Sequence, residues 1–303
     1  MAADTKTLSA LALIALLCGA GLYGPPGGPE GPALHAQAPP PARRIVSLVP
    51  AVTEMLFAIG AGPQVAGVSS YDDFPQDATT RPRVGALLDP DVERILSLRP
   101  DLVISYGTQT DLHSQMARAG IPVFSYRHAG LSGIFDTLQR LGPVTGHTTD
   151  AERLTRGLRA DLDRIRAAVA GRRRPNTLLV FDRDRATLRG LYVSGGRGFL
   201  HEMLEIAGAG TVFADIEREA VQPSQEMLLA RAPEVILEIR ATRLLPAAPA
   251  DEGRNAWAPL ASIPAVRNGR IHVLEGAHLV VPGPRVAQAT EDLARALHSG
   301  AFR

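Results

Sequence analysis

A glycine-rich turn is the stretch of this sequence whose residue types come nearest to a known catalytic chemistry. The segment "SGGRG", Ser194 to Gly198, stands between an apolar run and a helical pattern, where backbone N–H groups could cradle a phosphate. It lacks the spacing G-x-G-x-x-G, the chain contains no G-x-x-x-x-G-K-[ST], and Ser194 has no evident partner histidine. We therefore predict that the chain is not an enzyme, and we keep an α/β nucleotide-dependent enzyme as the less favoured alternative.

Metal ligands and nucleophilic thiols are scarce. Cys18 is the single cysteine, so the chain beyond it has no disulfide, no thiolate metal site and no cysteine nucleophile. His128 and His201 lack partners at metal-ligand spacing, and scattered histidines are more often solvated or hydrogen-bonded than ligating. We predict neither a metal site nor a resident cofactor.

Two glutamates occupy the same place in a repeated segment. "VERILSLRPDLVI" (92–104) and "QEMLLARAPEVIL" (225–237) share a Glu, central leucines, a Pro and a final apolar run, with Glu93 and Glu226 133 residues apart. Each acid falls in the first turn of an expected helix, where the helix dipole alone would stabilise it by ~0.3–1 kcal/mol. The repetition favours a shared role for both acids over this local one.

A second repeat shows that the chain contains two related halves. "EMLFAIGAG" (54–62) returns as "EMLEIAGAG" (202–210) at an offset of 148 residues, each after an apolar strand and a turn. Gly after the last turn and Pro before the next strand end the expected helices. Apolar runs such as "DLVIS" and "EVILEI" alternate with helical patterns, which favours parallel sheets covered by helices. We predict an α/β fold of two Rossmann-like lobes with a ligand cleft between them.

The first half carries a longer loop between its two repeated segments. The offsets of 148 and 133 residues differ by 15, and the extra residues fall within the segment 63–90. That segment contains Tyr71, Asp72, Asp73 and Phe74. Long surface loops that carry aromatic and acidic side chains are frequent binding sites, so we predict that this loop contacts a ligand.

A long helix is expected between the halves. Leu154, Leu158, Leu162, Ile165 and Val169 form one apolar stripe over 150–171, and Thr149 with Glu152 has the spacing of a capping box. Such a helix would couple the lobes stiffly. We predict a lead-in at 1–42, an N-terminal lobe at 43–147, the bridging helix at 148–174 and a C-terminal lobe at 175–303.

Composition and the N-terminus bear on the compartment. The 303 residues are 45% hydrophobic and 21% charged with a net charge of +1, so nucleic-acid binding is not expected. The run "LSALALIALL" (8–17) has the length of a signal-peptide core, and a Gly- and Pro-rich stretch follows it. We predict export, with cleavage near "AQA" (36–38) or a membrane tether through lipidation of Cys18 as alternatives.

These segments together resemble one family. "RIVSLVPAVTEMLFAIGAG", "VAGVSSYDDFP", "SGGRGFLHEMLEIAGAGTVF" and "VPGPRVAQATEDLARALH" resemble the periplasmic substrate-binding proteins of ABC importers, over residues 43–298. Within that group they are most similar to the vitamin B12-binding proteins and their haem- and iron–siderophore-binding relatives. The resemblance implies a monomeric, periplasmic, non-enzymatic protein that delivers a small molecule to a permease dimer with ATPase subunits. It also implies that Glu93 and Glu226 dock into arginine pockets of that permease.

The resemblance and the expected topology together suggest the ligand site. Ligands bind at the carboxyl ends of strands in open α/β sheets, which places Pro50, Ala51, Gly195, Gly196 and Arg197 on the cleft walls. The family pattern adds Tyr71, with Asp72 and Phe74 beside it, Tyr106 in place of a tryptophan, and His278 in a loop that borders the cleft. Other aromatics of the B12 binders are absent, and Trp257 is the sole tryptophan. We therefore expect a corrinoid first, and haem or a ferric siderophore as the alternative.

Overall fold

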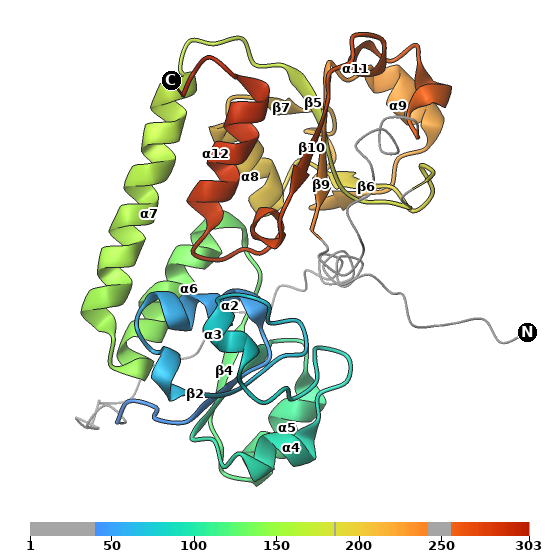
Figure 1. The fold of residues 1–303 in the computed structure, drawn as a ribbon. Helices are drawn as coiled ribbons and strands as arrows, with labels where there is room; N and C mark the ends of the chain where they lie inside the picture. The colour runs from blue at the N-terminus through green and yellow to red at the C-terminus, as the bar shows by residue number, and fades with distance from the viewer. Residues whose placement is uncertain (1–39, 185, 242–255, 303) are drawn as a thin grey trace, which may run out of the picture.

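The computed structural model describes residues 40–184, 186–241 and 256–302, which form two lobes joined on one side by a long helix (Figure 1). The predicted signal segment, the cleavage site at 36–38 and Cys18 lie outside these residues. Ala42, directly before the expected start of the first lobe at 43, is buried, and its N–H donates to the carbonyl of Val144 at 2.8 Å. Over the described ranges, no helix combines the length and the apolar character that a membrane span requires.

The first lobe is a parallel sheet covered by helices. In chain order its elements are β1 (Ile45–Ser47), α2 (Pro50–Ala58), η1 (Gly62–Gln64), β2 (Val65–Val68), α3 (Gln76–Thr79), α4 (Val92–Ser97), β3 (Leu102–Tyr106), α5 (Thr110–Arg118) and β4 (Val123–Tyr126). The strand order is β2-β1-β3-β4, and all neighbours are parallel. Successive side chains of β1 enter opposite layers: Ile45 packs with α2, and Val46 packs with Ile95 of α4.

The second lobe has a mixed sheet. Its elements are β5 (Asn176–Asp182), β6 (Tyr192–Ser194), α8 (Gly198–Ile206), β7 (Gly210–Thr211), β8 (Ala220–Val221), α9 (Gln225–Arg231), β9 (Val235–Arg240), η2 (Ala258–Leu260), α11 (Pro264–Arg267), β10 (Ile271–Glu275), η3 (Ala277–Leu279) and α12 (Val286–Leu297). The order is β10-β9-β5-β6-β8, with β7 also paired to β5. Strands β10, β9, β5 and β7 are parallel as predicted, whereas β6 runs antiparallel to both β5 and β8. The short β5–β6 loop explains this, because a parallel neighbour would need a longer crossover.

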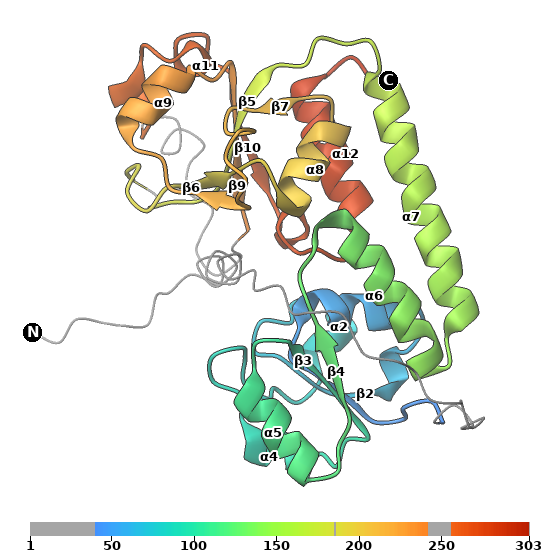
Figure 2. The ribbon, with the colours of Figure 1, turned by 180° about the vertical axis from the view of Figure 1, so that it is seen from behind.

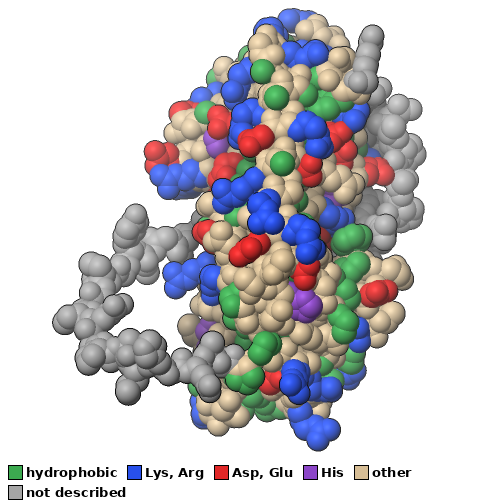
Figure 3. All heavy atoms as spheres, turned by 90° about the vertical axis from the view of Figure 1, so that its left-hand side faces the viewer, with side chains coloured by type: hydrophobic (Ala, Val, Ile, Leu, Met, Phe, Trp, Pro, Cys, Tyr) green, Lys and Arg blue, Asp and Glu red, His purple; other side chains and the backbone are tan. Residues whose placement is uncertain are grey.

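The predicted bridging helix is confirmed as α7 (Thr148–Val169), which has 22 residues. It follows α6 (Gly130–Thr145) almost directly. The predicted capping box is wrong, because the helix begins two residues earlier, with His147 and not Thr149 as its N-cap, and has no side-chain cap. Acidic and basic side chains alternate on the face that α7 presents in Figure 3, and pairs such as Asp150–Arg153 (2.7 Å) link neighbouring turns there.

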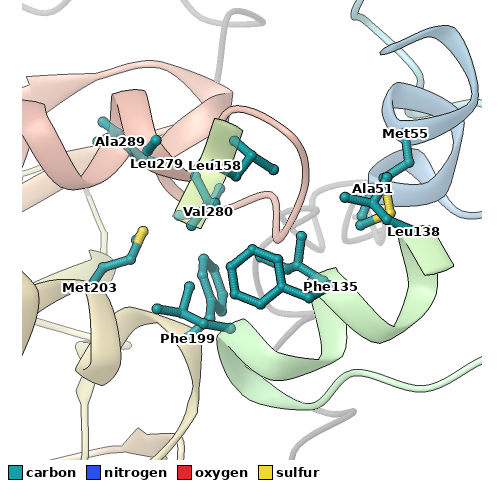
Figure 4. Close-up of a cluster of buried hydrophobic side chains, with 14 of the residues drawn as sticks. Ala51, Met55, Phe135, Leu138, Leu158, Phe199, Met203, Leu279, Val280 and Ala289 are labelled. Carbon is teal, nitrogen blue, oxygen red and sulfur yellow. The ribbon is translucent and has the colours of Figure 1, made fainter. Parts of the chain in front are cut away.

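One hydrophobic core continues from the first lobe into the second. It joins Met55 of α2, Leu138 of α6, Leu158 of α7, Met203 of α8 and Leu293 of α12, and Figure 4 shows much of this junction, with Phe135 and Phe199 at its centre. The lobes are therefore held together by packing as well as by α7, which the sequence did not predict. A packed interior resists deformation, so this junction favours a nearly fixed arrangement of the two lobes.

Candidate functional site: an interlobe cleft and two outer helices

The carboxyl ends of the first lobe's strands face the second lobe. Pro50 and Ala51 follow β1, the segment Ser69–Phe74 follows β2, and Tyr106 ends β3. These are the predicted cleft residues of this lobe, and the structure brings them to one edge of the sheet. Ligands bind at such edges because the strand ends leave loops free to diverge.

The loop after β2 presents two aromatic side chains to solvent. Tyr71 is 43% exposed and Phe74 is 44% exposed, and they are two of the five large hydrophobic side chains that are strongly exposed in the described ranges. The loop is held from within: Ser69 N–H donates to the Asp72 carboxylate at 2.7 Å, and the Arg83 guanidinium donates to the carbonyls of Ser69 and Asp72. The extra residues predicted from the sequence therefore form an ordered rim.

Asp72 supports this rim and offers no surface to the cleft, since it is only 1% exposed. Burial raises its pKa to about 7, although Thr53, the Ser69 N–H and Arg83 act in the opposite direction. Its Oδ1 has no hydrogen-bond partner among the described residues. In this structure Asp72 lies beneath the predicted binding surface and positions the loop that forms it.

An ion pair that the sequence did not predict crosses between the lobes at the base of the rim. Arg285, the N-cap of α12, donates to Glu54 of α2 at 2.5 and 2.8 Å, and the same guanidinium lies 4.0 Å from the centre of the Phe74 ring. Glu54 is 4% exposed, and burial raises its pKa against the opposing effect of Arg285. Ala51 is buried beside this pair, under the loop that contains Gly283. The only sequence signal was that Glu54 belongs to a repeated segment.

The Nε2 atom of His278 is engaged in a contact within the protein and is not directed at a ligand. That nitrogen lies 2.8 Å from Oδ2 of Asp292 on α12, and the side chain is 11% exposed. The ring also packs against Gly276, whose φ of +140° leaves room that a Cβ would fill. The observed contacts give His278 a role in joining η3 to α12.

An aromatic row runs from β3 of the first lobe to α8 of the second, and its members Tyr126 and Phe199 are buried. Tyr106 contacts Tyr126 edge to face at 5.8 Å, the Tyr126 hydroxyl lies 3.5 Å from His128, and His128 contacts Phe199 of α8 at 5.3 Å. Tyr106 was a predicted site residue, whereas His128 was set aside for lack of partners. Burial lowers the pKa of His128, and Glu219 opposes this effect from 3.5 Å. The row thus connects the predicted aromatic of the first lobe to the second lobe.

The glycine-rich turn of the second lobe is fully engaged by the protein. The N–H groups of Gly195, Gly196 and Arg197 donate to the carbonyls of Glu219, Ile216 and Arg218, respectively. A Cβ on Gly195 or Gly196 would come within 2.2 Å of a backbone oxygen, so these glycines permit close packing. Three occupied amides cannot cradle a phosphate. The turn also does not lie at the carboxyl edge of the parallel strands, as predicted, because β6 runs antiparallel to β5.

The carboxyl ends of β5 and β9 carry a basic cluster instead. Arg183 donates two hydrogen bonds to Glu238 at 2.7 and 2.9 Å, and Arg240 lies 3.4 Å from the same carboxylate. The indole N–H of Trp257 also donates to Glu238, at 3.3 Å. Arg240 is the more accessible arginine, with a side chain 23% exposed against 4% for Arg183. The two arginines share one carboxylate, and two more acids stand at the same edge of the sheet, Asp182 at the end of β5 and Glu275 of β10, which pairs in register with Arg240.

The two predicted docking acids stand on matching helices. Glu93 of α4 and Glu226 of α9 are both exposed, and the N-caps Asp91 and Ser224 accept from the N–H groups three residues on. Hydrogen bonding to Ser224 lowers the pKa of Glu226. The helices α4 and α9 lie at opposite ends of the molecule, both on the side away from α7 (Figures 1 and 2).

No group of three or more potential metal-ligating side chains occurs within 40–184, 186–241 and 256–302. The side chains that the structure places at the carboxyl ends of the strands are the aromatic rim of the first lobe and the two arginines around Glu238 in the second.

Comparisons with known proteins agree with this architecture. A family model described as periplasmic binding protein matches residues 45–277. The chain is 27% identical over 271 residues to the uncharacterized ABC transporter substrate-binding lipoprotein YvrC of Bacillus subtilis, covering 86% of this chain and 82% of that protein. It is 31% identical over 206 residues to a vitamin B12-binding protein of Yersinia pestis, covering 67% and 71%. The crystal structure of a periplasmic heme-binding protein from Pseudomonas aeruginosa superposes with a TM-score of 0.72 at 26% identity, covering 86% of this chain and 94% of that one.

Proposed function

Because the chain belongs to the periplasmic binding protein family, we propose that it is the solute-binding component of an ABC import system with a corrinoid as its ligand. It acts as an exported, periplasmic monomer that needs no resident cofactor, and it delivers its ligand to a permease dimer with ATPase subunits. The relatives support this assignment, since one is named for substrate binding and another for vitamin B12 binding.

The observation that carries the ligand class is the exposed aromatic pair on the rim. Tyr71 and Phe74 leave large ring surfaces in water, and a flat macrocycle such as a corrin would cover them. Tyr106 and the backbone around Pro50 extend the same wall in the first lobe. Across the cleft, Arg240 supplies a positive charge for an anionic substituent such as a phosphodiester.

Haem is the second candidate, and one further observation favours it. The Tyr71 side chain is accessible, and a tyrosine oxygen can serve as an axial ligand of haem iron. The basic cluster would then face the propionate groups. The chain is also similar over 86% of its length to the heme-binding protein of Pseudomonas aeruginosa, at 26% identity.

Glu93 and Glu226 are proposed to dock the protein on the permease. Both acids are exposed, and neither forms an ion pair with a residue in the described part of the chain. A pseudosymmetric pair of acids suits a partner with twofold symmetry. Exposed ion pairs contribute ~0.2–1 kcal/mol each, so these acids would orient the complex more than they hold it.

Titration calorimetry of the purified protein with cyanocobalamin, hemin and a ferric siderophore tests the ligand. We expect cyanocobalamin to bind, Tyr71→Phe to retain binding because the ring face remains, and Tyr71→Ala to weaken it by about fivefold or more. If hemin binds and Tyr71→Phe abolishes its iron–phenolate absorption band, the ligand is haem. Binding of a sugar or an amino acid with no response to any of the three chelates would contradict the proposal.

A further inference from the structure

Two leucines repeat beside the proposed docking acids. Leu96 of α4 and Leu229 of α9 are 38% and 44% exposed, and they are separated by the same 133 positions as Glu93 and Glu226. Only five large hydrophobic side chains are strongly exposed in the described part of the chain. The other three, Tyr71, Phe74 and Leu88, belong to the cleft rim or to the loop before α4.

The two short helices are anchored in the same way. Ile95 and Leu228, at equivalent positions, are 0% and 1% exposed and fix each helix to its lobe. Arg99 follows the C-cap of α4 with φ of 46°, and the equivalent Ala232 is the C-cap of α9 with φ of 44°; each stands directly before a proline. Left-handed conformations are unusual for residues other than glycine, so their recurrence shows that both segments turn towards the following strand in a similar way. The two helices therefore expose the acid and the leucine at equivalent places, while other exposed positions differ, as Ser97 and Ala230 do.

On each helix the acid and the leucine share one face. Residues three apart on a helix are neighbours, with about 5–6 Å between their Cβ atoms. Leu96 therefore lies one turn beyond Glu93, and Leu229 lies one turn beyond Glu226. Each lobe thus presents a carboxylate next to an apolar side chain, on a helix that lies on the side of the molecule away from α7 (Figure 2).

We propose that Leu96 and Leu229 are contact residues for the permease and that each lobe docks through a paired acid and leucine. This inference rests on the proposed function, since it names the surface by which the same partner is bound. The partner must present two equivalent sites, each with a cationic side chain beside an apolar depression. The desolvated leucines supply binding that persists when salt screens the acids. A bare lipid surface fits less well, because each leucine is accompanied by a carboxylate that an anionic membrane repels.

The test measures binding of the full-length mature protein to the purified cognate transporter in lipid nanodiscs, at low and at high salt. We expect the double variant Leu96→Ala/Leu229→Ala to weaken binding by about tenfold or more at both salt concentrations, and each single variant to lose part of that. Glu93→Gln/Glu226→Gln should weaken binding mainly at low salt. Leu88→Ala is the matched control, because Leu88 is a 65% exposed leucine outside the repeated helices, and it should bind as the wild type does.

The outcomes separate this inference from the proposal on which it rests. If the glutamate variants lose affinity and the leucine variants do not, the leucine inference is overturned while docking through the acids stands. If neither pair matters, both are overturned. Leucine-dependent binding to nanodiscs that contain lipid alone, or an equal loss from Leu88→Ala, would also overturn it. Ligand affinity and the melting temperature of the leucine variants must match the wild type, since both side chains lie outside the core.

Discussion

Asp72 lies directly beneath the aromatic rim of the cleft, and its buried carboxyl group makes that rim sensitive to pH. The pKa of Asp72 is about 7, against an ordinary aspartate value near 4, because burial disfavours the charged form. An unfolded chain releases this proton near pH 4, whereas the folded chain retains it up to about pH 7. Over that interval the folded state binds more protons, so the stability contributed by Asp72 falls as pH rises.

Asp72→Asn should remove this dependence. The Asn side-chain oxygen can still accept the Ser69 N–H, and the group no longer titrates. We expect urea unfolding of the wild type to give a free energy that declines between about pH 4 and pH 7 by a few kcal/mol relative to the variant. Asp73→Asn, at the exposed neighbour, is the control and should follow the wild type. Parallel curves for Asp72→Asn and the wild type would show that Asp72 is ionised in the folded protein throughout.

Among individual residues, the sequence predicted those that are aromatic and lie in the unusually long loop of the first lobe. Tyr71 and Phe74 were predicted because a repeat interrupted by extra residues with aromatic side chains marks a rim. Arg285 was not, because its partner Glu54 is 231 positions away and meets it only once the lobes pack. His278 and the glycine-rich turn were assigned to the cleft from pattern and family resemblance, and the structure shows both engaged in internal contacts.

The helices were predicted more completely than the strands. Gly60 and Gly208, with φ of 89° and 83°, end the nine-residue helices α2 and α8 as the second repeat predicted. The reversed direction of β6 escaped prediction, because an apolar run reports burial and carries no information on strand direction. The start of α7 was misplaced because the Thr149–Glu152 spacing fits a capping box that the helix does not use.

Replacing either of two glycines inside helices by alanine should change the free energy of unfolding, in opposite directions for the two positions. Gly157 lies on the exposed side of α7, where a Cβ would meet nothing within 4 Å, whereas a Cβ on Gly142 of α6 would lie 2.9 Å from the backbone of Thr148. Gly157→Ala should therefore raise the free energy of unfolding by about 0.5–1 kcal/mol through helix propensity. Gly142→Ala should lower it by roughly 1–3 kcal/mol, because the α6–α7 contact must open. Thermal unfolding of both variants measures this, and equal shifts would contradict the close packing of these helices.

At the scale of the whole molecule, the two lobes are joined by a pair of contacts at equivalent positions of the internal repeat. Glu54 of α2 and Glu202 of α8 occupy equivalent positions in the second repeat. Each contacts the N-terminal end of a helix of the other lobe, α12 for Glu54 and α6 for Glu202. Glu54 binds Arg285 at the N-cap of α12, and Glu202 accepts the N–H of Leu131 in the first turn of α6 at 2.9 Å. Together with the continuous core, these contacts explain why the two lobes should move little relative to each other.

The ion pair between Glu54 and Arg285 provides the test of this rigidity. Arg285→Met leaves a carboxylate that is 4% exposed without its partner, and breaking a buried pair in this way typically costs about 3–5 kcal/mol. The double variant Glu54→Gln/Arg285→Met removes both charges and should recover much of that loss, so the two substitutions should be strongly non-additive. Arg295→Met, which breaks the exposed pair with Glu291 on α12, is the control and should cost less than about 1 kcal/mol.

Two measurements on the wild type test the rigidity directly. Small-angle scattering with and without ligand should give nearly superimposable profiles, and denaturant unfolding should show a single cooperative transition. Additive effects in the cycle, or a large compaction of the wild type on binding, would mean that the lobes are joined by α7 alone and close as a hinge.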